Sequence, residues 1–212
     1  MTGNPSGYPA RLNVVYPETL SRLTTLLRPI CAIPILFILA AVCGVATWTT
    51  VEGESASSID DVTITDSLGV ATTLMIVFRR RYPRWWFNFA RELTRFGGRV
   101  IAYLCLLTDR YPSTEDEQSV HIDLDYPNAE ADLNRWLPLV KWLLSIPHAI
   151  VLAVLWVLAI PVLFGAWIAI LVTGTYPRPL FDYVVGVFRW SLRVSAYAVL
   201  LVTDRYPPFS LR

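Results

Sequence analysis

Two long apolar runs dominate the hydropathy pattern of the chain. The first extends from Pro29 to Val51 without a charged residue, and the second extends from Pro147 to Thr173. As a helix, the first run is about 34 Å long, enough to cross a hydrocarbon core of about 30 Å. A shorter apolar segment, 67–78, follows an acidic stretch. These runs predict helices embedded in a membrane.

Between the apolar runs lie segments with other periodicities. Residues 120–126 alternate apolar and polar positions as a half-exposed strand does, and residues 11–16 do so less cleanly. Polar lead-ins with helix N-cap signals, 19–27 and 128–137, precede the apolar runs. Each run is followed by an amphipathic segment that begins with the sequence YPR. There the pattern predicts a helix that lies in the membrane interface.

The chain repeats itself. The pentapeptide TDRYP occurs at 108–112 and at 203–207, and nine of 22 aligned positions between 82–103 and 176–197 are identical. Such self-similarity at a fixed period predicts a tandem duplication. We interpret TDRYP as the end of the amphipathic helix, since proline cannot continue a helix. A catalytic role for five adjacent residues at a helix end is the weaker alternative.

These patterns predict a mainly α, integral membrane protein built from two tandem copies. Each copy comprises a short strand, an apolar transmembrane or hairpin segment, and an amphipathic arginine-bearing interfacial helix. The first repeat covers 9–112 and contains the acidic loop 52–66, an acidic linker covers 113–119, and the second repeat covers 120–212.

Charge asymmetry predicts the topology of the first copy. Arginines precede the first run and follow the segment 67–78, whereas the loop 52–66 has none. Because Lys/Arg bias sets membrane orientation, we expect a multi-pass plasma-membrane protein with a cytoplasmic N-terminus and arginine-rich segments and an external acidic loop. Residues 1–28 contain no signal-peptide pattern. Membrane insertion is therefore expected to use the internal segments.

The second run allows two topologies. Pro161 is the position at which the first copy opens its acidic loop, so 149–160 and 162–172 can form a short hairpin that turns at Pro161. Alternatively, 147–173 is one long, proline-kinked span, since prolines are tolerated in membrane helices. Charge bias favours the hairpin slightly, because a single span would place arginines on the outer side.

Arginines align on one face of each amphipathic segment. Asn88, Glu92, Arg95 and Arg99 recur at helical spacing, and the second copy has Asp182, Gly186, Arg189 and Arg193 in these places. One interpretation is that the arginines anchor the helix by reaching to the headgroup level. The other is that Arg95, Arg99, Arg189 and Arg193 contact an anionic headgroup. The predicted interface anchors are Tyr82, Arg84, Tyr111, Tyr176, Arg178 and Tyr206.

Composition narrows the function classes. The net charge of +1 argues against a nucleic-acid partner. Cys31, Cys43 and Cys105 lie in apolar runs without paired spacing, which favours buried thiols over disulfides or a metal site. We therefore predict no catalytic, cofactor-binding or metal-binding residues.

One family resemblance covers nearly the whole chain. The sequence TGTYPRPLFDYVVGVFRWSLRVSAYAVLLVTDRYPPFSL at 173–211, after the lead-in that ends SIPH, resembles an uncharacterised actinobacterial membrane family, domain of unknown function number 4389. The first copy departs from this pattern with Asn88, Glu92 and the acidic loop. The resemblance implies membrane residence and transfers no activity.

The expected function is that of a non-enzymatic accessory, scaffold or lipid-organising component of the membrane. Its expected partners are anionic membrane lipids and a membrane protein. A small transporter or channel subunit is the alternative, although the apolar runs lack acidic residues for coupling. A lipid-acting enzyme is a weaker alternative, with Asp109, Asp204, His121 and His148 as its candidate groups.

Overall fold

The chain is mainly helical, as predicted. The computed structural model describes residues 8–43, 64–113, 118–128 and 133–211. The order of elements is β1 (Ala10–Val14), α1 (Arg22–Cys43), α2 (Ile64–Arg79), α3 (Arg84–Leu104), β2 (Val120–Leu124), α4 (Pro138–Thr173) and α5 (Arg178–Ala198). Most of the predicted acidic loop and linker lies outside the described residues, while 64–66 belong to α2 rather than to a loop.

Both predicted strands are present and pair with each other. β1 and β2 form a two-stranded antiparallel sheet in which Leu12 lies opposite Ile122. Buried and exposed residues alternate along both strands, β1 included, so the pattern in 11–16 is as regular as that in 120–126. One face of the sheet is therefore buried, as the period of two requires.

The two halves of the chain exchange their strands. β1, from the first half, packs on α5, and β2, from the second half, packs on α3. On the side of α3 and α5 away from the strands, α1, α2 and α4 pack together. The larger hydrophobic core draws residues from both halves, including Leu12, Phe87, Ile122 and Phe181. The halves are therefore interlocked.

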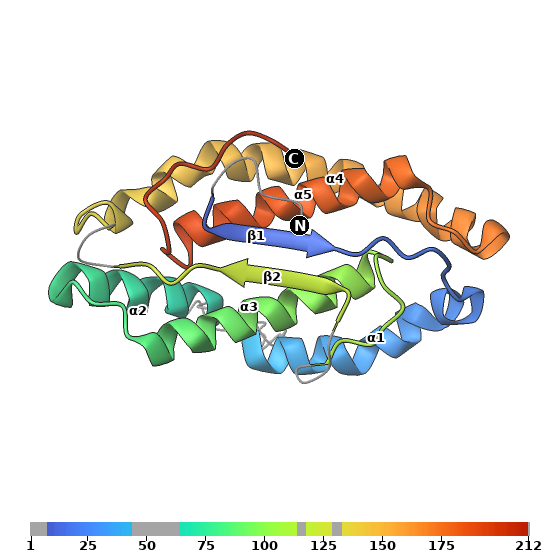
Figure 1. Cartoon of the computed structure of the whole chain (residues 1–212), viewed down its shortest axis with the longest axis horizontal. Helices are drawn as coiled ribbons and strands as arrows, with labels where there is room; N and C mark the ends of the chain where they lie inside the picture. Colours follow the sequence, from blue (N-terminus) through green and yellow to red (C-terminus); the bar gives the residue numbers. More distant parts are fainter. Residues whose placement is uncertain (1–7, 44–63, 114–117, 129–132, 212) are drawn as a thin grey trace, which may run out of the picture.

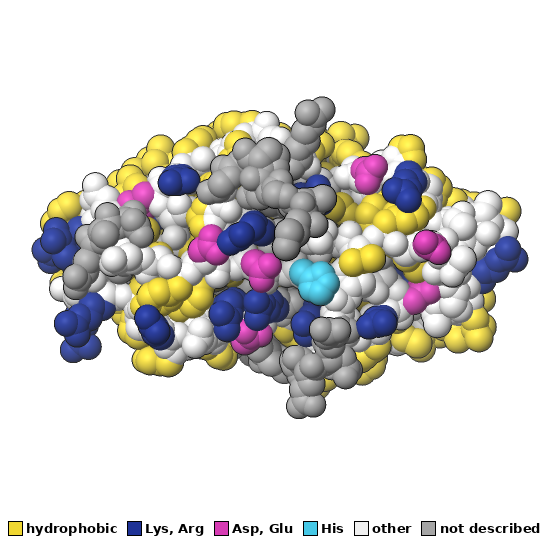
Figure 2. Space-filling model, in the orientation of Figure 1, with side chains coloured by type: hydrophobic (Ala, Val, Ile, Leu, Met, Phe, Trp, Pro, Cys, Tyr) yellow, Lys and Arg dark blue, Asp and Glu magenta, His cyan; other side chains and the backbone are white. Residues whose placement is uncertain are grey.

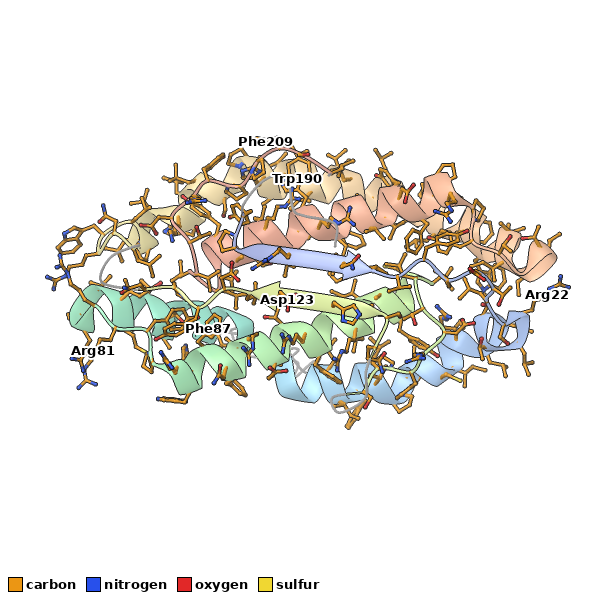
Figure 3. The ribbon with its side chains drawn as sticks, in the orientation of Figure 1. Arg22, Arg81, Phe87, Asp123, Trp190 and Phe209 are labelled. Atoms are coloured by element: carbon orange, nitrogen blue, oxygen red, sulfur yellow. The ribbon has the colours of Figure 1, made fainter. Side chains whose placement is uncertain are left out.

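Of the two topologies left open for the second run, the structure has the continuous helix, and the first half differs from the predicted hairpin. α4 is one helix from Pro138 to Thr173, with Pro147 and Pro161 inside it, so the chain does not turn at Pro161. In the first half, α1 and α2 follow one another along the same long edge of the molecule (Figure 1). Arg22 and Arg81 consequently lie at opposite ends of the molecule (Figure 3). The reason is tertiary packing, because α4 runs along the other edge and contacts both α1 and α2.

Proline precedes both amphipathic helices, and a leucine with positive φ follows the end of each. Pro83 and Pro177 occupy the N-cap positions of α3 and α5, as the YPR pattern predicts. The predicted end at TDRYP is wrong, because α3 stops at Leu104 and α5 at Ala198. Leu106 and Leu201 have positive φ angles of 64° and 55°. In α3, bonds from Leu106 and Leu107 back to the last turn form a Schellman cap.

Candidate lipid-contacting site

The TDRYP aspartates connect each amphipathic helix to the apolar helix of its own half. Asp109 accepts a 2.6 Å hydrogen bond from the backbone N–H of Ser21 and pairs at 2.5 Å with the buried Arg28 of α1. Asp204 accepts a bond from the backbone N–H of Asn134 and pairs at 2.7 Å with Lys141 of α4. Carboxylates are stabilised by such N–H donors near a helix start. TDRYP therefore acts as a structural clamp.

The arginine stripe faces protein. Arg95 and Arg189 donate hydrogen bonds from Nε to the carbonyl groups of Ile122 and Leu12, at 2.9 and 3.2 Å. Arg99 and Arg193 donate to loop carbonyl groups of Ser113 and Ser210. Burial, together with the positive charge of Arg189, lowers the pKa of the Arg193 guanidinium. These four side chains hold the strands and loops on the helices, and contact with headgroups stays a prediction.

The predicted interface anchors divide into two groups. Tyr82 and Tyr176 are buried, and burial raises the pKa of both phenols. Arg84 and Arg178 are exposed and stack over tyrosines of the opposite half, with Cζ 5.4 Å from the Tyr126 ring centre and 4.1 Å from the Tyr16 ring centre. Tyr111 and Tyr206 are exposed. Anchoring by this second group stays a prediction.

Large apolar side chains are exposed along α1, α2 and α4. On α4 they occur from Leu139 near its start to Val172 near its end. On α1 and α2 they include Ile30, Ile33, Phe37, Leu74 and Phe78. By length and composition, α1 and α4 could each cross a membrane. Soluble monomers rarely expose contiguous apolar surface of this extent, and such patches mark interaction with membranes or proteins.

The face that carries the strands has the opposite character. Figure 2 shows basic and acidic side chains spread over this face, from its middle to both ends of the long axis, with hydrophobic side chains mainly along the upper and lower rims. Arg95 pairs there with Glu92 at 3.0 Å and with Asp123 at 3.4 Å. Arg11 pairs with Asp125. Asp123 lies between the two ends of the long axis that Arg22 and Arg81 mark (Figure 3).

One corner joins these two surfaces. Arg79, Arg80, Arg81 and Arg84, together with Trp85 and Tyr126, line an open cavity of about 840 Å³ between α2 and α3, which we call the arginine corner. Among the described residues, no carboxylate forms an ion pair with Arg79, Arg80 or Arg81. In the sequence, this arginine run predicted only the membrane orientation. The run of three arginines beside an apolar segment is the signal that could have predicted the corner.

Arg80 holds a backbone conformation that ordinarily suits glycine. Its φ is 50°, and the aligned residue of the second half is Gly174, with φ of 76°. A left-handed conformation costs an ordinary L-residue roughly 1 to 2 kcal/mol. Thr173 and Thr175 flank this glycine, at the positions where the first half has Arg79 and Arg81. The first half therefore has a cationic corner that the second half lacks, and Arg80 adopts a strained conformation within it.

The candidate groups for an enzyme are exposed or have structural contacts. His121 is exposed on β2 opposite Asn13, and the two aspartates serve the clamps. His148 is buried, accepts a hydrogen bond from Trp190 Nε1 at 3.2 Å and stacks on Phe209. Of the cysteines, Cys105 is buried as predicted, whereas Cys31 is exposed on α1. Cys43 has no described side chain.

The second half of the chain matches a known family. The model of the family described as domain of unknown function (DUF4389) matches residues 136–210. The predicted resemblance is therefore confirmed for one copy, which comprises α4, α5 and the tail that follows them. No curated protein and no solved structure matches the chain.

Proposed function

We propose that this protein is a non-enzymatic, lipid-organising component that lies flat in one leaflet of the plasma membrane. The layer formed by α1, α2 and α4 is immersed among acyl chains, and the strand face is in water. The observation that carries this proposal is the apolar surface along the full length of α4, opposite a charged face.

The length of α4 supports a flat orientation. Its 36 residues extend roughly 54 Å, whereas the hydrocarbon core is about 30 Å thick. Even at a tilt of about 40°, the upper end of the observed range, an upright α4 would leave several exposed apolar residues in water. Lying flat, the helix immerses all of them. A layer one helix thick, about 10 Å, also fits within half of the core.

The charged face supports the same orientation. If the long axis stood across the bilayer, Glu92, Asp123 and Asp125 would lie at its middle depth. Each would cost roughly 2.5 to 3.5 kcal/mol there. The multi-pass topology expected from the charge pattern would bear this cost. In the flat orientation both arginine-bearing ends face the same, cytoplasmic side, in keeping with the Lys/Arg bias.

The arginine corner supplies a contact for anionic headgroups. Guanidinium groups bind phosphate with paired N–H donors, and Trp85 is two-thirds exposed beside them, where an interfacial tryptophan is expected. A phospholipid phosphate bound at this corner would place its acyl chains along α2. We assign membrane lipids as the ligands of the arginine corner and of the apolar layer. Binding of a membrane protein to that layer is the alternative.

A tandem duplication accounts for the architecture, and we include it in the proposal. Corresponding contacts in the two halves support it. Tyr16 donates to the carbonyl of Tyr176, and Tyr126 donates to that of Tyr82. The clamps of Asp109 and Asp204 correspond in the same way. In this view α4 is the unbroken counterpart of α1 and α2 together.

Labelling of single cysteines from one side tests the orientation. In a variant lacking the three native cysteines, we would introduce Arg22→Cys, Arg81→Cys or Asp123→Cys, expose each to a membrane-impermeant maleimide, and compare intact with inverted vesicles. The flat orientation predicts that all three positions label from the cytoplasmic side only. Labelling of Arg22→Cys and Arg81→Cys from opposite sides, or protection of Asp123→Cys, would refute it. Recovery of the protein in the aqueous fraction without detergent would refute membrane residence itself.

A further inference from the structure

An apolar cavity lies between the two halves of the molecule. Its volume is about 370 Å³, and its walls come from α2, α3, β2, α4 and α5. Leu68, Leu93, Ile122, Trp156 and Leu192 supply much of the lining. Pockets that hold small molecules begin at about 300 Å³, so the cavity is large enough for a segment of a hydrocarbon chain.

Three of the four polar side chains in the wall, those of Thr94, Trp156 and Ser191, are already hydrogen-bonded, and the fourth is Ser195. Thr94 donates to the carbonyl of Ala90, and Ser191 donates to that of Val187. Trp156 Nε1 in turn donates to Ser191 Oγ at 3.1 Å. A roomy site whose lining offers few unsatisfied polar groups stays dry and accepts apolar ligands. The lining therefore selects hydrocarbon.

Gly97 keeps this space open. A Cβ atom at Gly97 would meet nothing within 4 Å, whereas a Cβ atom at Gly98 would come within 2.3 Å of Ile122 Cδ1. Close packing therefore requires glycine at position 98 but not at position 97. Glycine within a helix lowers helix stability, so the bare position 97 has a cost that local packing does not explain. The cavity is the feature that a side chain at position 97 would fill.

We propose that this cavity binds one acyl chain of a membrane phospholipid. The inference rests on the proposed function, because lipid reaches the cavity from the apolar layer. Trp156 belongs to α4 and Leu68 to α2, so helices of that layer form part of the cavity wall. Gly97 and Trp156 are half-buried, which places the cavity at the surface rather than in a sealed interior. A lipid held there would bridge the two halves of the fold.

Photocrosslinking tests this assignment. The full-length protein is reconstituted with a phosphatidylcholine that carries a diazirine on one acyl chain, and adducts are mapped by mass spectrometry. The measured quantity is the ratio of adducts on the cavity residues Leu93, Trp156 and Leu192 to adducts on Val154 and Val157, which are exposed on α4. We expect adducts in the cavity of the native protein, and we expect Gly97→Leu to lower the ratio at least fivefold.

Gly165→Leu is the matched control. This α4 glycine also has nothing within 4 Å of an added Cβ atom but does not line the cavity, so the ratio should not change. Leu93→Trp fills the cavity from the same wall and should act like Gly97→Leu, with Trp156 and Leu192 as its remaining cavity positions. Absence of cavity adducts, or a ratio that neither variant lowers, would overturn the proposal while adducts on Val154 still report membrane residence. Loss of cavity adducts on adding equimolar palmitate would assign the cavity to free fatty acid and overturn the phospholipid assignment.

Discussion

Replacing Asp204 by asparagine should destabilise the protein strongly, and more than replacing its partner Lys141 does. The Lys141 Nζ atom lies 2.7 Å from Asp204 Oδ1 and 2.7 Å from the Thr203 carbonyl oxygen. Lys141 itself is 0% exposed. Asp204→Asn removes the negative charge and leaves this ammonium group buried beside neutral acceptors. Breaking a buried ion pair in this way costs about 3 to 5 kcal/mol.

Replacing the other partner, Lys141, should destabilise the protein less. Lys141→Met replaces the buried ammonium by an apolar chain of similar length. Asp204 then keeps the N–H of Asn134, and its side chain is 20% exposed to solvent. We expect a loss of about 1 to 2 kcal/mol, close to that of an ordinary hydrogen bond. The double variant Lys141→Met/Asp204→Asn should be more stable than Asp204→Asn alone.

Reversible unfolding of the purified protein in mixed detergent–SDS micelles measures these differences. The matched control is Asp109→Asn in the first half, where Arg28 is 3% exposed and also donates to the carbonyl of Tyr103. Its cost should fall in the same range. A smaller cost for Asp204→Asn than for Lys141→Met, or a double variant that is the least stable of the three, would contradict the role of the unpaired buried ammonium group.

Three further predictions concern other contacts. Arg80→Gly should raise the free energy of unfolding by about 1 kcal/mol and reduce flotation with anionic over zwitterionic vesicles; unchanged flotation would remove Arg80 from the headgroup contact. Arg189→Gln should lower the free energy of unfolding by about 1 kcal/mol through its lost bond to Leu12, with Arg95→Gln behaving alike; a shift in headgroup preference without destabilisation would instead support the headgroup role. Burial raises the pKa of the Cys105 thiol to about 12. The raised pKa stabilises the fold below about pH 8.5, the pKa of an unfolded cysteine, and this contribution is lost as pH rises toward 12. Peptide mapping should therefore find Cys105 unlabelled by maleimide at pH 8 unless SDS is added, and labelling of the folded protein would contradict this.

Local pattern determined the elements of this protein. Alternation in 120–126 predicted a half-buried strand, and YPR marked the entry to α5, which begins at Arg178 after Pro177. The uncharged run from Pro29 and the run from Pro147 predicted the helices that expose apolar surface. These predictions succeeded because periodicity of side-chain burial and proline geometry act over a few residues, which the sequence displays directly.

Only the tertiary structure decided how the elements are arranged. The alignment of the two halves allowed either a turn or a continuous helix at Pro161, and the structure has the continuous helix α4, which packs against α5, α1 and α2. The arginine stripe is typical of an interface helix, yet Arg95 and Arg189 bind strands contributed by the opposite half. Lys141 pairs within its own half, but its partner Asp204 also lies far along the chain. A sequence shows which residues are charged or apolar, but the partner that neutralises a charge is chosen by contacts between distant segments, and those exist only once the chain has folded.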